Sequence, residues 1–331
     1  MINFKAFSPS KNQSHYSAVK GIGAYLPERI VTNYDLEKMV DTTHDWIVER
    51  TGIHSRHLAQ EEETVASMGE VAAKIALENA GITPQDIDLI IVSTASPEKF
   101  FPSTACMIQG RLKAKHCMAF DITAACTGFL YALDIANQYI RTGAAKHVLI
   151  VSTELTSRLA NWEDRNTCVL FGDGAGAVVL AASEEPGIIA SQLHSTPDEK
   201  DILSMLTGIY DKTPTKYYLT MQGREVFKVA VNYIVDSVND LLRISGLTIN
   251  QIDWLIPHQA NYRIVDLAAE KLNMPREKVI FTLQEHANTS SASIPLALYE
   301  SVKTQKIKKG DLVMLSAFGS GLTWGSVLLK V

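Results

Sequence analysis

The sequence predicts an α/β fold built from two similar halves. Three observations carry this prediction: alternating helical and strand patterns in the first half, and two short segments that return in the second half. Apolar residues recur at helical spacing over residues 65–76, Gly81 can end that helix, and the apolar residues 89–92 are typical of a buried strand. Alternation of this kind is characteristic of α/β proteins.

Two internal repeats occur in the same order along the chain. The segment GITPQDIDLII, from Gly81, returns as GLTINQIDWLI from Gly246. The segment FGDG at residues 171–174 returns as FGSG at residues 318–321, and an apolar strand pattern follows each copy. Repeated units in a fixed order indicate a duplicated fold.

The segment EEPG at residues 184–187 is the best candidate for the boundary between the halves, because Pro and Gly favour a turn. We therefore predict an N-terminal half, residues 1–185, which carries the nucleophile, and a C-terminal half, residues 186–331. A connection this short is no flexible linker, so the halves are expected to pack tightly.

Composition excludes several classes of function. The chain has 331 residues, of which 46% are hydrophobic and 20% charged, as in ordinary globular proteins. The formal net charge is -5 with no basic block, so nucleic acid is not an expected partner. The apolar runs fall far short of the roughly 20 residues that span a bilayer, so no membrane association is expected.

The N-terminus and the cysteines suggest a cytoplasmic protein. Residues 1–20 lack the basic and then apolar layout of a secretion signal, and they are interpreted as a short polar extension. The four cysteines form no C-x-x-C pair, which favours a reducing compartment over a disulfide framework.

Cys126 is the candidate nucleophile. It lies in the segment TAACTGF, between an apolar strand at residues 118–122 and a helical pattern from Phe129 to Ile140. At a helix N-terminus, unpaired amides and the helix dipole favour thiolate over thiol, so a lowered pKa is expected. The alternative is a small buried residue, which is the interpretation kept for the other three cysteines.

His258 and Asn288 are the candidate partners of Cys126. His258 follows a strand at residues 253–256, and ligands bind at the carboxyl ends of strands in α/β sheets. Asn288 lies where a strand near Phe281 is expected to lead into a helix that starts near Ser290. The alternatives are a structural histidine and a plain helix cap. His286 is a competing candidate.

The two glycine-rich segments have different expected roles. The segment around Asp173 superficially suggests a dinucleotide loop, but a strand follows it where a phosphate-binding helix is required, so nucleotide binding is rejected there. Its glycines are expected to permit a tight bend. The FGSG segment at residues 318–321 could aim a backbone amide at a thioester oxyanion, or form a purely structural turn.

Six motifs in order resemble the type III β-ketoacyl-acyl-carrier-protein synthases, members of the thiolase superfamily. The resemblance covers nearly the whole chain from about Val19. The motifs are DWIVERTGI from Asp45, AACTGF from Ala124, FGDGAG from Phe171, PHQAN from Pro257, ANTS from Ala287 and FGSGLTWG from Phe318.

This resemblance implies a thiolase-like, five-layered αβαβα fold, a homodimer and a decarboxylating condensation that initiates fatty-acid synthesis. Cys126 would accept an acyl group from a short acyl-coenzyme A, with acetyl as the expected primer, and the amides of Cys126 and Ser320 would form the oxyanion hole. His258 and Asn288 would then support decarboxylation of malonyl-acyl carrier protein. The last cysteine is Cys168, so the late second cysteine of thiolases is absent.

The resemblance also assigns binding residues. Trp46 and Arg165 would sandwich the adenine of coenzyme A, Arg50 would bind its nucleotide end, and Gly223 would line the pantetheine channel. Lys228 and Arg263 would dock an acidic carrier protein. Further contacts and departures from the family pattern concern three positions: Phe101 would close a small acyl pocket, Ser320 replaces a frequent glycine, and Arg224 replaces a frequent asparagine.

No metal and no permanently bound cofactor is expected, because coenzyme A enters as the thioester substrate and decarboxylation itself generates the carbon nucleophile. Two alternatives stay open. One is a specialised condensing or acyltransfer enzyme of secondary metabolism that uses Cys126, His258 and Asn288. The other is a non-catalytic protein that binds acyl-coenzyme A or an acyl carrier.

Overall fold

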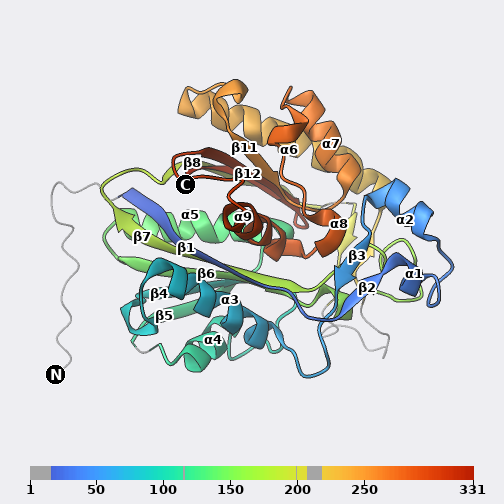
Figure 1. The fold of residues 1–331 in the computed structure, drawn as a ribbon, viewed down its shortest axis with the longest axis horizontal. Helices are drawn as coiled ribbons and strands as arrows, with labels where there is room; N and C mark the ends of the chain where they lie inside the picture. Colours follow the sequence, from blue (N-terminus) through green and yellow to red (C-terminus); the bar gives the residue numbers. More distant parts are fainter. Residues whose placement is uncertain (1–15, 115, 199, 207–217) are drawn as a thin grey trace.

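Two β-sheets and three helical layers alternate through the molecule, so that five layers stack in the order αβαβα. A computed structural model describes residues 16–114, 116–198, 200–206 and 218–331. Helices α3 and α4 form one outer layer, α5 and α9 lie between the sheets, and α6 and α7 form the other outer layer (Figure 1).

The first sheet contains five strands in the order β1-β7-β6-β4-β5. Strand β4 is parallel to both β5 and β6, whereas β7 is antiparallel to β6 and to β1. All five residues of β4 are buried, as expected for a strand covered on both faces. The strand bounds are β1 Tyr16–Tyr25, β4 Leu89–Ser93, β5 Met118–Ile122, β6 His147–Glu154 and β7 Gly174–Ser183.

The second sheet repeats this plan with four strands, in the order β8-β13-β12-β11. Strand β11 is parallel to β12, and β13 is antiparallel to both β12 and β8. The counterpart of β5 is reduced to one bridge between Val279 and Leu255. The bounds are β8 Ile188–Ser195, β11 Trp254–Pro257, β12 Leu312–Gly319 and β13 Thr323–Lys330.

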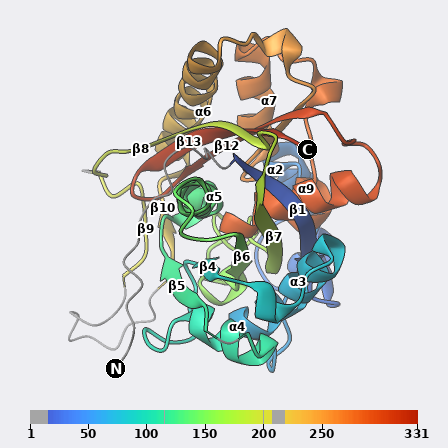
Figure 2. The ribbon, with the colours of Figure 1, turned by 90° about the vertical axis from the view of Figure 1, so that its left-hand side faces the viewer.

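Helices α5 and α9 are buried between the sheets, and Figure 2 shows α5 nearly end-on in this position. Phe129 and Leu133 of α5 and Ile294 of α9 pack with Ile150 of β6 and Leu315 of β12 in one core cluster. The helix bounds are α3 Val65–Ala80, α4 Thr104–Leu112, α5 Gly128–Arg141, α6 Gly223–Ser245, α7 Tyr262–Lys271 and α9 Ser293–Lys303.

Smaller elements complete the edges of the molecule. The short helices are α1 Asn33–Leu36, α2 His44–Thr51 and α8 Leu283–His286, and two strand pairs are β2 Ile30–Thr32 with β3 Ser55–His57 and β9 Leu203–Ser204 with β10 Thr220–Met221. Six 3-10 turns are described: η1 Pro84–Asp86, η2 Ala125–Thr127, η3 Thr156–Arg158, η4 Ile249–Gln251, η5 Arg276–Lys278 and η6 Ser290–Ala292.

The first sequence repeat is structurally the same in both copies. Gly81 ends α3 with φ +67°, and Gly246 ends α6 with φ +69°, which is the left-handed conformation that favours glycine. A capping box then opens each 3-10 turn, at Thr83 before η1 and at Thr248 before η4. The strands β4 and β11 follow, so the repeat reflects a duplicated unit.

Two local expectations from the sequence are wrong. Residues 16–20 belong to β1 and are not part of a polar extension, because residues 16–19 pair with β7. The segment before Asn288 is the short helix α8 where a strand was expected, since the counterpart of β5 is reduced to the bridge at Val279. Apolar residues at 279–281 are compatible with either form.

The strands of the first sheet lie within residues 16–183 and those of the second within residues 188–330. The residues 184–187 join β7 to β8. The helix α9 and the turn η6 of the second half pack against β7 of the first, so the two halves share a core. The division into residues 1–185 and 186–331 therefore stays a prediction.

We predict that Gly21→Ala destabilises the protein. A Cβ atom at Gly21 would lie 2.1 Å from the carbonyl oxygen of Ala76, so β1 and α3 would have to separate. We expect a loss of about 1–3 kcal/mol in the free energy of unfolding, measured by urea denaturation. The matched control is Gly110→Ala in α4, where the new Cβ meets nothing within 4 Å. This variant should increase the free energy of unfolding by about 0.5–1 kcal/mol, because alanine favours the helix over glycine. Equal stability of the two variants would contradict this packing.

Candidate active site

One cavity of about 1550 Å³ brings the three predicted catalytic residues together. Cys126, His258 and Asn288 all line it, although they come from three separate segments of the chain. Each segment follows the carboxyl end of a strand or its counterpart: Cys126 follows β5, His258 follows β11, and Asn288 follows the Val279 bridge and α8. The duplicated fold therefore assembles the site from equivalent edges of the two sheets.

Cys126 lies in the turn η2, immediately before α5. Ala125 adopts the left-handed conformation, with φ +44°, which is strained for a residue with a Cβ atom and is found often at functional sites. The loop after β12 closes on this turn, because a Cβ at Gly319 would lie 2.9 Å from the Cys126 nitrogen. Only glycine fits there.

The expected lowering of the Cys126 pKa is wrong. Burial raises the pKa of the thiol to about 12; a contact with Ser290 opposes this shift and the charge of Glu154 adds to it. Burial therefore favours the protonated thiol. Attack by the sulfur requires an acceptor for that proton.

His258 is held as a neutral imidazole. It is 4% exposed, and burial lowers its pKa to about 3. Its Nδ1 atom lies 2.6 Å from Ser293 Oγ, which also accepts a 3.3 Å hydrogen bond from the Gln259 amide. Because the serine oxygen accepts from that amide, its own proton is available for Nδ1. When Ser293 donates its proton to Nδ1, the ring hydrogen lies on Nε2, and Nε2 is then a donor.

Asn288 is fixed through both its backbone and its side chain. Its amide donates to the carbonyl of Leu170 over 2.9 Å, and its carbonyl accepts from the Gly172 amide over 3.1 Å. Its side-chain oxygen accepts a 2.8 Å hydrogen bond from the amide of Ser290. With the amide oxygen occupied, the Nδ2 group is the remaining donor.

The glycines around Asp173 allow close approach and do not make the expected tight bend. A Cβ at Gly172 would lie 2.6 Å from the His286 carbonyl oxygen, and strand β7 begins at Gly174. The Asp173 carboxylate is buried and accepts hydrogen bonds from Ser157 and from the Ala59 amide. This segment holds Asn288 in place.

Ser320 follows β12 and lines the cavity. Its hydroxyl donates a 2.5 Å hydrogen bond to the carbonyl of Leu203 in β9, and its own carbonyl accepts from Thr323 Oγ1 over 3.1 Å. The same Thr323 hydroxyl hydrogen is shared with the carbonyl of Ala124, which lies 3.2 Å from Oγ1. The serine side chain thus anchors the loop, and the loop is tied to the turn that carries Cys126.

Trp46 and Arg50 line the cavity, whereas Arg165 stands beside it. The Arg50 and Arg165 guanidinium carbons each lie 5.0 Å from the Trp46 ring centroid. Arg165 also donates a 2.9 Å hydrogen bond to the Asp41 carbonyl. An adenine stacked between Trp46 and Arg165 needs a separation of roughly 7–8 Å between the two side chains, which is the thickness of two van der Waals contacts. Arg165 must therefore move outward to admit the adenine.

Most of the charged residues that line the cavity are basic. Arg50, Arg158, Arg224, Lys228 and Arg263 face two acidic side chains of the same lining, those of Glu98 and Asp164. Both carrier-docking candidates are exposed: Lys228 pairs with Glu225 at 3.0 Å, and Arg263 lies over the Phe227 ring at 5.8 Å. Such a surface attracts anionic ligands.

The remaining predicted positions differ in their distance from the cavity. Gly223, the first residue of α6, lines it together with Arg224. Phe101 does not line it and is 85% exposed, whereas its neighbour Phe100, 69% exposed, does. A large exposed aromatic side chain beside a cavity suits a position that contacts another chain.

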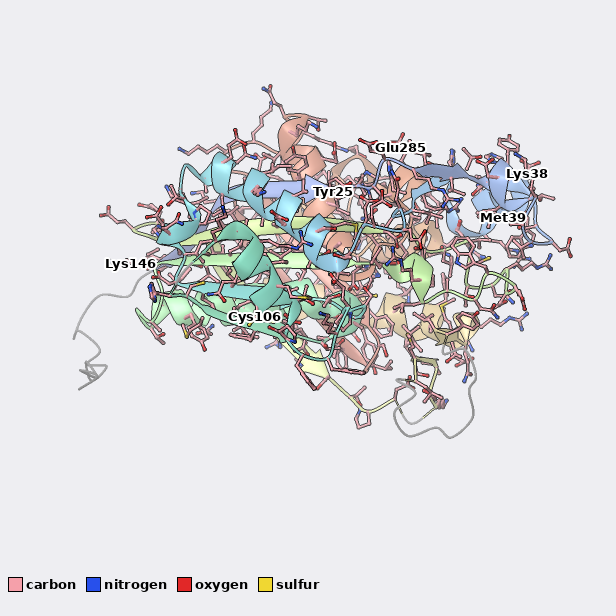
Figure 3. All side chains as sticks on the ribbon, turned by 90° about the horizontal axis from the view of Figure 1, so that it is seen from below. Tyr25, Lys38, Met39, Cys106, Lys146 and Glu285 are labelled. Atoms are coloured by element: carbon pink, nitrogen blue, oxygen red, sulfur yellow. The ribbon has the colours of Figure 1, made fainter. Side chains whose placement is uncertain are left out.

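His286 and the other cysteines lie elsewhere. His286 is buried against His57, and burial lowers its pKa to about 4, but it does not line the cavity. Among the cysteines, only Cys126 lines it. Cys106 lies on the outer helix α4, as Figure 3 shows, and Cys117 and Cys168 are also free thiols.

Three residues of the site were missed by the sequence analysis. Ser290 Oγ lies 3.6 Å from Cys126 Sγ, Ser293 binds His258, and Glu154 is a fully buried carboxyl that acts on the Cys126 thiol. The run of hydroxyl residues after Asn288 was the available signal for the serines. A glutamate at the end of the apolar strand 148–154 was the signal for Glu154.

Within the described ranges, no group of three or more His, Cys, Asp or Glu side chains is placed so that it could hold a metal ion. None of the helices described there combines the length and the apolar character that crossing a bilayer requires.

Comparison with family models gives two matches. Residues 120–197 match the 3-oxoacyl-[acyl-carrier-protein] synthase III model, and residues 242–331 match the model of the C-terminal part of the same family. The first includes Cys126, and the second includes His258 and Asn288.

Comparison with known proteins agrees with the two family-model matches. The chain is 51% identical over 319 residues to a β-ketoacyl-[acyl-carrier-protein] synthase III of Methylococcus capsulatus, covering 96% of this chain and 99% of that protein. It is 52% identical over 320 residues to the protein of the same name from Agrobacterium fabrum, covering 95% and 99%.

Solved structures match over nearly the whole chain. The 3-oxoacyl-[acyl-carrier-protein] synthase III of Aquifex aeolicus is 48% identical with a TM-score of 0.91, covering 95% of this chain and all of that one. A priming β-ketosynthase from the R1128 polyketide pathway is 36% identical with a TM-score of 0.92, covering 96% and 97%. These matches confirm the thiolase-like fold and a condensing acyltransferase that initiates fatty-acid synthesis, and the chain belongs to the β-ketoacyl-acyl-carrier-protein synthase III family.

Proposed function

We propose that this enzyme condenses a short acyl-coenzyme A, with acetyl as the primer, with malonyl-acyl carrier protein, and that Cys126, His258 and Asn288 are its catalytic residues. The observation that carries the proposal is the meeting of these three side chains in one cavity. Each has a distinct chemical capacity: a nucleophilic sulfur, an Nε2 donor and an Nδ2 donor. The product is a β-ketoacyl-acyl carrier protein and carbon dioxide.

In the first half-reaction, the Cys126 sulfur attacks the thioester carbonyl of the acyl-coenzyme A. Negative charge develops on the carbonyl oxygen, and backbone amides of Cys126 and Ser320 stabilise it. The close approach of Gly319 to the Cys126 nitrogen supports this role, because it brings the loop that carries Ser320 against the nucleophile turn. Coenzyme A then leaves, and the acyl group stays on sulfur.

In the second half-reaction, malonyl-acyl carrier protein occupies the emptied cavity. The His258 Nε2–H and the Asn288 Nδ2–H donate to its thioester carbonyl as carbon dioxide departs, and they stabilise the enolate that forms. Neutral donors suit this step, since burial keeps His258 uncharged. The enolate carbon attacks the acyl-cysteine, which releases the Cys126 thiolate.

We predict that His258→Ala and Asn288→Ala each slow malonyl decarboxylation by about 10²–10³-fold, because each removes one preorganised donor. Acyl transfer onto Cys126 should remain partly intact, because the amides of the oxyanion hole are unchanged. Release of labelled carbon dioxide and acylation of Cys126 measure the two half-reactions separately. Decarboxylation at the wild-type rate in both variants would refute the assignment.

Coenzyme A is proposed to bind at Trp46, Arg50 and Arg165, with its pantetheine arm along Gly223. The Trp46 ring and the two guanidinium groups that lie over it support this role. The contact between Arg165 and Asp41 has to open when the adenine enters. Arg224, which departs from the family pattern, adds a positive charge next to Gly223.

Lys228 and Arg263 are proposed to dock the acidic acyl carrier protein at the mouth of the cavity. We predict that Arg263→Glu lowers kcat/KM for malonyl-acyl carrier protein by about tenfold or more and flattens its dependence on salt. A small malonyl thioester should be affected little. Arg243→Glu, an exposed arginine of the same helix layer that does not line the cavity, is the matched control. Identical kinetics of the two variants would contradict this docking role.

Phe101 is proposed to close the acyl pocket of a partner subunit in a homodimer. Its exposure in the single chain supports a contact of this kind. We predict that acetyl-coenzyme A is used at least about tenfold better than octanoyl-coenzyme A, and that Phe101→Ala narrows this difference. The measurement is kcat/KM for primers of increasing length. Efficient use of octanoyl-coenzyme A by the wild type would instead favour a specialised condensing enzyme of secondary metabolism.

The proposed cellular location is the cytoplasm. Coenzyme A is the leaving group of the primer, and no resident cofactor is part of the proposed reaction. Four free cysteines suit a reducing compartment.

A further inference from the structure

The two amides proposed for the oxyanion hole come from opposite halves of the chain. Cys126 lies in the turn η2, whereas Ser320 lies at the tip of the hairpin formed by β12 and β13. Gly319 and Thr323 face each other at the neck of this hairpin. Donors of an oxyanion hole act best when they are held in advance around one oxygen atom. Since the two segments are far apart in the chain, contacts between the hairpin and η2 must set the spacing of the two amides.

Gly319 provides the steric part of this contact. A Cβ atom at this position would lie 2.9 Å from the Cys126 nitrogen and 3.2 Å from Thr127 Oγ1. The backbone of the hairpin therefore lies directly against the nucleophile turn. Close packing limits how near the two segments can come, but it does not fix their orientation. Hydrogen bonds are directional, so they are suited to fixing it.

Two threonines provide the polar part of the contact. The Thr127 hydroxyl donates to the Thr323 carbonyl over 3.1 Å. In return, Thr323 Oγ1 lies 3.2 Å from Thr127 Oγ1. The single hydrogen of Thr323 Oγ1 is shared with two carbonyls, that of Ala124 at 3.2 Å and that of Ser320 at 3.1 Å. Thr323 is thus bonded to residues on both sides of Cys126 and to the residue that carries the second amide.

Thr127 does not do what a threonine at its position usually does. It is the N-cap residue of α5, where a threonine side chain normally accepts a hydrogen bond from an amide of the first helical turn. No such bond forms at this helix. The side chain is buried, and its hydroxyl bonds across to the hairpin instead. The hydroxyl of Thr127 therefore serves the contact between the two halves of the chain and not the helix that it precedes.

We propose that Thr127 and Thr323 form a threonine clamp, a pair of positioning residues that sets the spacing of the Cys126 and Ser320 amides and thereby the rate of acyl transfer. The inference rests on the proposed oxyanion role of these two amides. Neither threonine lines the cavity, so the clamp acts on the substrate through the backbone of its neighbours. As negative charge develops on the thioester oxygen, the clamp keeps both amides directed at that oxygen.

The clamp should affect acyl transfer and spare decarboxylation, because the donors proposed for decarboxylation are held by other contacts. His258 is fixed through Ser293, whose hydroxyl oxygen lies 2.6 Å from Nδ1. Asn288 is fixed by a 2.9 Å hydrogen bond from its amide to the Leu170 carbonyl. These two contacts do not involve the hairpin or the clamp. The rates of acylation and decarboxylation therefore report on separate supports of one cavity.

The test replaces each hydroxyl with a methyl group, in Thr127→Val and Thr323→Val, which keep the branched shape of the side chain. At saturating acetyl-coenzyme A, each variant should form the acetyl-enzyme about 10–10²-fold more slowly, because a displaced donor stabilises the oxyanion less well. The KM for acetyl-coenzyme A and the rate of malonyl decarboxylation should stay within about threefold. Thr127→Ser and Thr323→Ser keep the hydroxyl, and their acylation rates should stay within about threefold of the wild-type rate.

Ser17→Ala is the matched control for the loss of a buried hydroxyl. Ser17 of β1 donates a 2.9 Å hydrogen bond to the side-chain oxygen of Asn137 in α5, and neither residue lines the cavity. This variant should lose stability to urea as the valine variants do, yet form the acetyl-enzyme at the wild-type rate. If Thr127→Val does not fold, Thr323→Val, at the less buried end of the clamp, carries the test.

Three results would overturn the clamp. One is acylation at the wild-type rate in a folded valine variant. Another is an equal loss of acylation and decarboxylation, which would mark a general disturbance of the cavity. The third is a loss of acylation that the serine variants share, since the hydroxyl would then not be the group that matters. A wild-type enzyme that forms no acetyl-enzyme at all would instead refute the proposed function, so the two failures are distinguishable.

Discussion

The close packing of the two turns η2 and η6 between the sheets is the constraint on which the rest of the site depends. Each turn opens a central helix, and each begins with a residue forced into the left-handed conformation, Ala125 or Ser290. Strain of this kind persists only where the surroundings fix it. Here the surroundings are the ends of β6 and β12, which close on the opposite turns through Glu154 and Gly319.

Burial sets the electrostatics of this site. Burial keeps His258 neutral and raises the pKa of the Cys126 thiol, so the uncharged form of both groups is favoured at rest. In the proposed reaction, neutral hydrogen-bond donors stabilise charge where it develops on the substrate, and they are not already engaged with an anion of the protein. The basic residues are kept at the mouth, where they attract anionic substrates without charging the interior.

The sequence predicted the parts of this structure that local chemistry determines. The helix-ending glycines Gly81 and Gly246 occur where a left-handed residue is needed, and the duplication follows from their shared context. The protonation of Cys126 was mispredicted, because burial depends on η6, a segment more than 150 residues away. Glu154 was missed for the same reason: its partners Ser96 and Ser291 come from opposite halves of the chain.

The central claim is that Cys126 accepts the acyl group, and the most direct test is mass spectrometry of the protein after incubation with acetyl-coenzyme A alone. One acetyl group should be found per chain, and peptide mapping should place it on Cys126. An unmodified Cys126 would contradict the account and would favour a protein that only binds the thioester. An acetyl group on Cys106, Cys117 or Cys168 would contradict it equally, because none of them lines the cavity.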